Sequence, residues 1–342
     1  MKVVKLGKSG LVVPKNGFGA LPIQRISDSD AVYLIQKALD HGLYYFDTAR
    51  FYTDSEAKLG QALCDRRDKA VISTKTGATT AEAFWKDLET SLNLLRTDYV
   101  DLYQFHNPSF CPKPDDGTGL YEAMQLAVQQ GKVRHIGITN HRLAVAHEAV
   151  DCGLYETLQF PFSYLASDKE LALVEACANA DMGFIAMKGL AGGLINHAAT
   201  AYAYLDQFPH VAPIWGVQRE CELDEFISFI DNPPQLNDEM RARIAHDREE
   251  LAGDFCRGCG YCQPCPMGIE IESCNRMYLF LRRAPYSVYL TEEFAEKMKQ
   301  IEQCLECGKC KAKCPYGLDI PTLLKRNYAD FKDHWARRAE LL

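Results

Sequence analysis

Short apolar runs recur along the first two thirds of the chain, and they constrain the fold more than any other feature of the sequence. Each run is at most seven residues long, rich in β-branched or aromatic side chains and nearly continuous in apolarity, as expected of a strand that is buried on both faces. Eight such runs occur, at 17–21, 43–47, 70–75, 100–106, 134–139, 156–160, 183–188 and 210–216. Parallel strands need long crossover connections, so the intervening segments should contain helices.

Helical patterns do occupy segments between these runs. Segment 27–42 begins with a capping serine, has apolar residues at spacings of three and four, and stops at Gly42. The same form recurs at 81–97, 120–132, 142–153 and 167–183. Eight strands alternating with helices predict an α/β fold, a closed (β/α)8 TIM barrel over residues 1–235. An open dinucleotide-binding sheet is the weaker interpretation because no G-x-G-x-x-G follows the first strand.

Both ends of this barrel segment carry further signals. The opening segment 3–14 predicts a small hairpin that caps the barrel floor. Two prolines at 233–234 indicate a domain boundary, and a helical pattern follows at 238–253. We therefore expect a second, smaller and mainly helical domain over residues 236–342.

Charge and hydropathy exclude several classes of protein. The formal net charge is -8, and no basic run is interleaved with aromatic residues, so the sequence predicts no binding to nucleic acid. No apolar run reaches the ~18 residues of a membrane span, and the N-terminal segment lacks the apolar core of a signal peptide. The sequence thus predicts a cytoplasmic protein that does not associate with membranes.

Polar side chains stand at or just after the ends of three successive predicted strands. These are Asp47, Tyr52 in the loop that follows it, Lys75 and His106. In a barrel of this kind, functional residues lie on the carboxyl ends of the strands. A buried lysine paired with an aspartate and placed near a phenol favours the phenolate, so that the tyrosine can protonate a carbonyl oxygen. The histidine would orient that oxygen, while the carbonyl carbon accepts a hydride from a cofactor.

The segments "FDTARFYTDSE", "STK" and "LYQFHNP" resemble the catalytic motifs of the aldo/keto reductases, with Asp47, Tyr52, Lys75 and His106 at matching positions. The resemblance extends over residues 1–235 and implies an NAD(P)H-dependent reductase of a small carbonyl substrate. It also implies a set of cofactor contacts. These contacts are Thr139, Asn140 and Gln159 for the nicotinamide carboxamide, and Met187, Lys188, Gly216 and Arg219 elsewhere on the cofactor.

Two positions depart from the family pattern. Met187 stands where an aromatic ring usually stacks on the nicotinamide, and Phe226 stands where a polar residue is expected near the adenine. A lost stacking contact is worth roughly 1 kcal/mol. The segment 215–229 follows the family loop for the adenosine phosphate only loosely, so the choice between NAD and NADP stays open.

Eight of the 14 cysteines form two dense motifs in the second domain. The later motif has the spacing C-x2-C-x2-C-x3-C-P, which is known from [4Fe–4S] clusters of bacterial ferredoxins. A zinc ion prefers two separated ligand pairs, and disulfides are disfavoured in a reducing compartment, so both are the weaker alternatives. Two-cluster ferredoxins exchange their fourth ligand, which predicts two [4Fe–4S] clusters. One would take Cys256, Cys259, Cys262 and Cys314, and the other Cys304, Cys307, Cys310 and Cys265.

Together these features resemble a subfamily of aldo/keto reductases with a C-terminal ferredoxin-type domain. The prediction is an oxidoreductase that reduces a carbonyl with Tyr52 as general acid and passes electrons through two clusters, with a ferredoxin- or flavodoxin-type redox partner. Met187 and Phe226 keep open an alternative, an electron-transfer protein on a barrel scaffold without hydride chemistry. A third interpretation has purely structural clusters. Of the other cysteines, Cys111 and Cys274 are the two for which a role beyond packing is considered.

Overall fold

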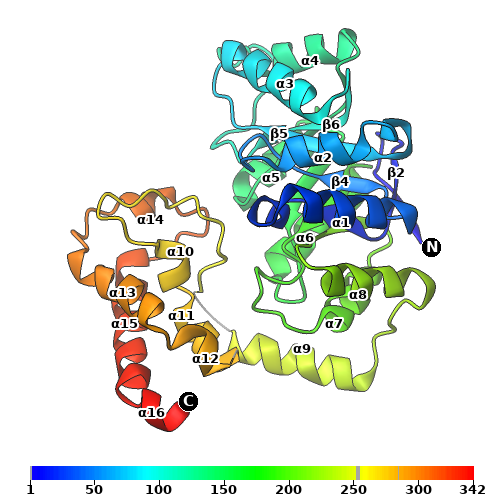
Figure 1. The fold of residues 1–342 in the computed structure, drawn as a ribbon. Coiled ribbons are helices and arrows are strands. Elements are labelled where there is room, and N and C mark those ends of the chain that lie inside the picture. Colours follow the sequence, from blue (N-terminus) through cyan, green and yellow to red (C-terminus); the bar gives the residue numbers. More distant parts are fainter. Residues whose placement is uncertain (1, 252–254, 284) are drawn as a thin grey trace. The chain divides into compact units, whose positions relative to one another are not determined.

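The computed structural model describes residues 2–251, 255–283 and 285–342 (Figure 1). The chain forms two compact units, which are described separately. The barrel unit comprises Met1–Leu190 and His197–Ala245, and the cluster unit comprises Ala191–Asn196 and His246–Leu342. The predicted boundary between residues 235 and 236 precedes the helix α9 (Asp238–Glu250), whereas the two units divide within this helix.

Eight parallel strands close the barrel unit into a cylinder, as predicted. The strands are β3 (Gly17–Gly19), β4 (Tyr45–Asp47), β5 (Val71–Thr76), β6 (Val100–His106), β7 (Val133–Thr139), β8 (Thr157–Pro161), β9 (Gly183–Met187) and β10 (Val211–Gly216). Each strand pairs in parallel with its neighbours in the chain, and β10 pairs with β3 to complete the closure. Nearly every residue of these strands is buried, which explains their continuous apolarity in the sequence.

Helices connect the strands around the cylinder (Figure 1). They are α1 (Asp28–Asp40), α2 (Ser55–Leu63), α3 (Ala81–Leu95), α4 (Leu120–Gln129), α5 (Leu143–Asp151), α6 (Asp168–Asn179), α7 (Ala198–Asp206) and α8 (Glu220–Asp231), with 3-10 turns η1 (Pro22–Arg25) and η2 (Arg67–Lys69). The five helices expected from the sequence are present, and three of them, α1, α3 and α6, begin with a side-chain cap. Ser27 Oγ accepts a hydrogen bond from the amide of Asp30, for example, at the start of α1.

The sequence did not predict α2, α7 and α8. Most residues of α7 are buried, so this helix has no polar face and no amphipathic period. Polar residues such as Glu56 and Lys58 lie on the buried side of α2, which reverses the usual pattern. The region of α8 was interpreted as a loop, but a helix begins there, where the Glu222 carboxylate accepts hydrogen bonds from the amide and the guanidinium of Arg219.

A hairpin of β1 (Val3–Lys5) and β2 (Val12–Pro14) precedes the barrel. Its inward residues Val4 and Val13 belong to one apolar cluster with Tyr45, Leu102 and Ala212 from the barrel strands. All five side chains are almost completely buried. The hairpin therefore closes the amino-terminal end of the cylinder with apolar side chains, as expected, and leaves the carboxyl end for polar groups.

The cluster unit is mainly helical. Its helices after α9 are α10 (Ile271–Cys274), α11 (Met277–Arg283), α12 (Tyr286–Tyr289), α13 (Glu292–Lys299), α14 (Lys309–Lys313), α15 (Ile320–Ala336) and α16 (Arg338–Leu341), with a 3-10 turn η3 (Gln300–Gln303). The single helix predicted for 289–303 is wrong in detail, because Thr291 caps α13 and separates it from α12. Residues 252 and 253 of the predicted helix 238–253 lie outside the described residues.

Apolar side chains of the cluster unit gather around its cysteines. Ile271, Met277, Leu324 and Phe331 form a buried core, against which Cys265 and other cysteines of the motifs pack. This core is small for a unit of its size, so the cysteines make up a large share of the buried interior. In the part of the chain that the structure describes, no helix is both long and apolar enough to cross a membrane.

Candidate active site and cysteine centre

Three neighbouring strands bring the predicted catalytic residues to one end of the barrel. Asp47 is the last residue of β4, Lys75 lies one residue before the end of β5, and His106 ends β6. The three strands are consecutive neighbours in the barrel, and Asp47 lies opposite Ser73 in the β4–β5 register. All three side chains therefore stand at the carboxyl end, where barrel enzymes place their chemistry.

Asp47 and Lys75 form a buried ion pair. The Lys75 Nζ lies 2.7 Å from Asp47 Oδ2 and donates a second hydrogen bond, of 2.6 Å, to the carbonyl oxygen of Thr48. Ser73 Oγ donates to the other Asp47 oxygen at 2.7 Å. The two charged side chains are 2% and 1% exposed. Burial lowers the pKa of Lys75, and the charge of Asp47 opposes that shift.

Tyr52 and His106 lie above this pair. The Lys75 Nζ is 5.4 Å from the centroid of the Tyr52 ring, and the Tyr52 and His106 rings meet edge to face with centroids 5.9 Å apart. Burial, and then the charge of Lys75, lowers the pKa of His106 to about 3. The imidazole is therefore neutral at physiological pH. Its Nδ1 is buried and has no hydrogen-bond partner among the described residues.

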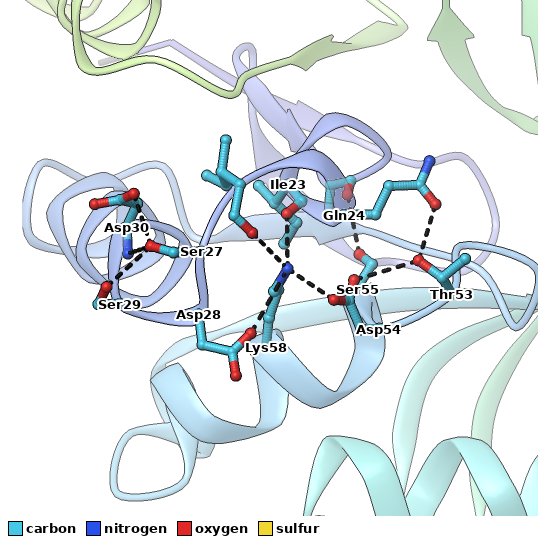
Figure 2. A network of polar contacts seen from close by, with 12 residues as sticks. Ile23, Gln24, Ser27, Asp28, Ser29, Asp30, Thr53, Asp54, Ser55 and Lys58 are labelled. Carbon is cyan, nitrogen blue, oxygen red and sulfur yellow. Dashed lines mark hydrogen bonds and ion pairs between the residues drawn. The ribbon is translucent and has the colours of Figure 1, made fainter.

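A buried lysine fixes the loop that carries Tyr52 (Figure 2). Lys58 Nζ, on α2, donates to the carbonyl oxygens of Ile23 at 3.1 Å and Ile26 at 2.8 Å. It also forms an ion pair of 2.8 Å with Asp54, two residues after Tyr52. The loop is thereby held between η1 and α2, and this positions the tyrosine.

Phe51 was not predicted as a site residue, although it packs against the site. Its ring stacks on His106 with centroids 5.4 Å apart, and the side chain is 61% exposed. A Cβ atom at Gly77 would lie 2.0 Å from this ring, so the ring lies directly over a glycine backbone. The exposed face of Phe51 makes it a candidate wall of the substrate site, and nothing but its place beside Tyr52 marks it in the sequence.

The predicted carboxamide contacts lie on the next two strands. Thr139 ends β7, Asn140 follows it, and Gln159 lies on β8. Gln159 donates to Asp47 Oδ2 at 3.3 Å and accepts from Gln104 at 2.8 Å. Asn140 donates to the carbonyl oxygen of Pro108 at 2.9 Å. The two amides are thus oriented by protein groups, and each nitrogen has a second N–H for another acceptor.

Ser73 and Gln104 were missed, yet both orient site residues. Each stands two residues before a predicted site residue on the same strand, Lys75 and His106 respectively. Side chains two apart on a strand point to the same face, so strand periodicity would have found them. The polar layer inside this end of the barrel is larger than the predicted set.

The remaining predicted cofactor residues do not form one group. Met187 ends β9, and its sulfur lies 4.0 Å from the Thr139 hydroxyl. Lys188 follows with a left-handed backbone, at φ 59°. Gly216 ends β10 and is exposed. The Arg219 guanidinium, predicted near a phosphate, pairs with Glu222 at 2.7 Å on the surface.

Phe226 does not face a cofactor site, contrary to the expectation. Its ring is 2% exposed and stacks on Trp215 at 4.7 Å, and its carbonyl oxygen accepts from Asn16. It belongs to the packing between α8 and the barrel. The departure from the family pattern at this position thus reflects core packing, and it gives no evidence of a lost adenine contact.

The cysteines of the cluster unit form two groups that overlap at Cys262. One group lines a single cavity and consists of Cys262 and Cys265 with Cys304, Cys307 and Cys310. In the other group, Cys259 and Cys314 lie close enough to Cys256 for their charges to act on its pKa, which burial raises. Cys262 is likewise influenced by Cys256 and Cys259, and burial raises its pKa to about 12. Cys262 thus has neighbours in both groups, and the division of the eight thiols between two clusters stays a prediction.

Cys274 stands apart from both groups. Its side chain is 1% exposed in the apolar core, and its sulfur lies 3.6 Å from the carbonyl oxygen of Lys297. Burial raises its pKa to about 12. These features describe a small side chain in the core. No disulfide joins any of the 14 cysteines, all of which lie in the described ranges.

Two family models match the chain. The aldo/keto reductase family matches residues 15–225, and a 4Fe-4S dicluster domain matches residues 255–319. Among curated relatives, L-galactose dehydrogenase of Arabidopsis thaliana is 32% identical over 209 residues, which cover 56% of this chain and 66% of that protein. Methylglyoxal reductase of Salmonella typhi is 34% identical over 148 residues, 41% of this chain and 52% of that protein. The chain thus spans between half and two thirds of these relatives.

Solved structures share the barrel. An aldo-keto reductase from Bacillus halodurans in its holo form superposes with a TM-score of 0.63 at 22% identity, covering 72% of this chain and 96% of that chain. An aldo-keto reductase from Klebsiella pneumoniae in complex with NADPH superposes with a TM-score of 0.62 at 24% identity, covering 72% of this chain and 94% of that chain. At this level of identity the likeness concerns the fold.

Proposed function

We propose that this chain, which belongs to the aldo/keto reductase family and carries a 4Fe-4S dicluster domain, is an NADP(H)-dependent reductase of a small carbonyl compound. The observation that carries the proposal is the stacked arrangement at the barrel end. A buried Asp47–Lys75 ion pair lies beneath the Tyr52 ring, and a neutral His106 lies at the edge of that ring. A general acid, a positive charge and a polar orienting group are thus within reach of one substrate atom.

The residues for the cofactor fit a nicotinamide carboxamide. Asn140 and Gln159 each have one amide N–H beyond those that their protein partners take, and Thr139 offers a hydroxyl beside them. We assign the carboxamide to these three side chains, and the remainder of the cofactor to Met187 and Lys188 after β9 and to Gly216 and Arg219 after β10. When bound, the cofactor supplies the hydride that the carbonyl carbon accepts. The Klebsiella pneumoniae aldo-keto reductase was solved in complex with NADPH, and this supports NADP(H) over NAD(H).

Each catalytic side chain then has a separate task. Tyr52 donates its phenolic proton to the carbonyl oxygen as the negative charge develops there. Lys75 stabilises the phenolate that remains, and Asp47 keeps the lysine charged within the barrel despite the burial that lowers its pKa. His106 stays neutral because its pKa is about 3, so it orients the oxygen by hydrogen bonding.

In the cluster unit, we assign two [4Fe–4S] clusters to the eight cysteines. Cys304, Cys307, Cys310 and Cys265 would hold one cluster, and all four line one cavity, which Cys262 also borders. The other would take Cys256, Cys259, Cys262 and Cys314, a set supported by the electrostatic contacts of Cys256. The thiolates bind the iron, and each motif then lends its fourth cysteine to the other cluster.

We further propose that the clusters carry single electrons to or from a small redox protein of the ferredoxin or flavodoxin type. One-electron carriers are the usual partners of such clusters. The matched 4Fe-4S dicluster domain supports this role. The carbonyl substrate, and the coupling of hydride transfer in the barrel to electron transfer through the clusters, are parts of the same proposal.

The test is the variant Tyr52→Phe, assayed with NADPH and methylglyoxal as the carbonyl probe. We expect the turnover to fall by about 10²–10⁴, the usual contribution of a positioned general acid. The iron content should stay at about eight per chain, as two four-iron clusters require. Tyr33→Phe, an exposed tyrosine on α1, is the matched control and should keep full turnover. Unchanged turnover in Tyr52→Phe would refute the catalytic assignment.

A second measurement addresses the clusters. Wild-type protein should bind NADPH in a titration followed by fluorescence, and its clusters should be reduced and reoxidised reversibly, as followed by EPR. If NADPH does not bind while the clusters remain redox-active, the barrel acts as a scaffold for electron transfer. If the clusters cannot be reduced, they have a structural role.

A further inference from the structure

Two cysteines outside the cluster motifs lie against each other in the barrel unit. Cys111 lies in the loop between β6 and α4, and Cys152 is the capping residue at the end of α5. Each of these two thiols acts on the pKa of the other, and the Cys152 thiol donates a hydrogen bond of 3.3 Å to the carbonyl oxygen of Ala149. We propose that Cys111 and Cys152 form a reversible disulfide, with a low-molecular-weight disulfide as the oxidant. The proposal is independent of the function assigned to the barrel.

Contacts on both sides hold the two backbone segments together. The hydroxyl of Tyr155, three residues after Cys152, donates to the carbonyl oxygen of Pro112 at 2.5 Å. The hydroxyl of Tyr121, on α4, donates to the carbonyl oxygen of Leu154 at 3.0 Å. Lys113 adds an ion pair of 2.6 Å with Glu148 on α5. These contacts hold the segment around Cys111 beside the end of α5, and no disulfide joins the two cysteines.

The two thiols differ in exposure and in acidity. Cys111 is 4% exposed, whereas Cys152 is partly exposed. The hydrogen bond from Cys111, with help from the Leu154 amide and the Lys113 charge, lowers the pKa of Cys152 to about 6. The same hydrogen bond, together with burial, raises the pKa of Cys111. Cys152 is therefore the accessible thiolate at neutral pH and reacts first, and the buried Cys111 thiol reacts second.

The exchange has two balanced steps. The Cys152 thiolate attacks one sulfur of a small disulfide RSSR, so that a mixed disulfide forms and RS⁻ leaves. Cys111 then loses its proton, which the departing thiolate takes, and attacks the Cys152 sulfur. The Cys111–Cys152 bond forms and the second RS⁻ leaves, taking from water the proton that Cys152 had lost before the first attack. Overall, two cysteine thiols are oxidised by two electrons, and RSSR is reduced to two RSH.

Closing this bond would act on the loop that borders the candidate active site. The loop begins directly after His106, with Asn107. Asn107 Oδ1 accepts from the His141 amide at 3.1 Å, and Pro108 accepts from Asn140. A covalent tie at Cys111 would restrain the far side of a loop whose near side is already bound to cofactor-site residues. Oxidation of the two thiols would thus restrain the loop that borders the substrate site and could change the shape of that site.

The test uses the anaerobic holoprotein incubated with glutathione disulfide, then alkylated, digested and analysed by mass spectrometry. We expect a peptide pair linked through Cys111 and Cys152 in the wild type and in Cys64→Ser, which removes an exposed cysteine elsewhere in the barrel unit as the matched control. In Cys111→Ser, glutathione should remain attached to Cys152. In Cys152→Ser, neither product should form at this site. A wild-type protein that retains glutathione on Cys152 and forms no link overturns the proposal.

A second measurement needs no variant and no enzymatic turnover. The alkylation rate of Cys152 in the wild type should rise with a midpoint near pH 6, because the thiolate is the reacting form. A midpoint at about 8.5, the ordinary value for a cysteine, would overturn the order of attack. Neither experiment depends on carbonyl reduction, so a failure here is separate from a failure of the reductase assignment.

Discussion

The candidate active site and the cysteine centre satisfy their polar groups in opposite ways. In the barrel, Asp47 receives hydrogen bonds from Ser73, Lys75 and Gln159, all from the chain itself. In the cluster unit, two groups of thiols lie around apolar side chains, and most are partly or fully buried. The buried Asp47 carboxylate has its partners before any ligand arrives, whereas a set of thiols of this kind becomes complete only with metal.

This difference indicates where each unit obtains its stability. The barrel closes eight strands around many buried apolar side chains. A bound cofactor would therefore add to the stability of the barrel only the free energy of its own binding. The cluster unit has a small core that includes its cysteines, and in small metal domains the metal-binding free energy is folding free energy. The barrel should fold without ligands, and the cluster unit should not.

Removal of iron is the strongest way to break this comparison. Oxidative destruction of the clusters followed by chelation should unfold the cluster unit, because metal binding contributes about 10 kcal/mol or more in small metal domains. The barrel should keep its thermal transition. Limited proteolysis, mapped by mass spectrometry, should then cut residues 255–342 and leave the barrel unit intact. If the iron-free cluster unit resists the protease as well as the holoprotein does, the contrast between the units is wrong.

The variant Lys75→Met tests whether the barrel site is held by its own pairs. Losing the ammonium leaves the Asp47 carboxylate buried without its charge partner, which costs about 3–5 kcal/mol of unfolding free energy. Urea unfolding followed by tryptophan fluorescence measures the loss. Lys132→Met removes a more exposed ion pair with Glu89 and should cost no more than about 1 kcal/mol. Equal losses in the two variants would contradict the self-sufficient site.

The Lys58 network predicts a smaller effect. In Lys58→Met, the carbonyl oxygens of Ile23 and Ile26 lose a buried donor, which costs about 1–3 kcal/mol. The loop that carries Tyr52 should also loosen, so the turnover of the reductase should fall while the iron content stays unchanged. Hydrogen exchange of the loop amides measures this directly. Exchange rates equal to those of the wild type would show that the network does not hold the loop.

The smallest effect concerns pH. Because the pKa of His106 is about 3 in the folded protein and about 6.5 in the unfolded chain, the unfolded chain binds the extra proton between these values. This contribution to stability is complete above about pH 6.5 and is lost as the pH falls, by at most about 1.4 kcal/mol per pH unit. His106→Gln should flatten the stability of the barrel between pH 7 and 5.5 in urea unfolding. A slope equal to that of the wild type would contradict the burial of a neutral imidazole.

The strand pattern predicted the barrel well because strands buried on both faces have a distinctive composition. All eight runs contain or overlap the observed strands, and the polar residues at the strand ends lie at the same end of the barrel. The helices α2 and α7 could not be predicted from periodicity. The buried face of α2 carries charged residues such as Lys58. Most residues of α7 are buried, so that helix has no exposed polar face.

Site residues could be predicted where the residue type itself indicates a chemical role. They could not be predicted where a residue has a role only because of the neighbours that the fold places beside it. Lys75 and His106 are notable at a strand end, and the cysteine spacing is specific for a 4Fe-4S dicluster domain. Phe51 becomes part of the site only because Gly77 leaves room for its ring. Phe226 was assigned by its place in the family pattern, but its surroundings are those of a core residue.

Cysteines of both motifs line one cavity, and this arrangement has a consequence during synthesis of the chain. With the fourth ligands exchanged as proposed, the first motif emerges from the ribosome a few seconds before Cys314, at about 5–20 residues per second. Until Cys310 is made neither cluster has its four ligands, and the cluster that takes Cys314 is completed last, while the whole barrel sequence has already been made. The maturation of the enzyme therefore has a fixed order, in which the barrel folds first and iron delivery waits for the last thiol.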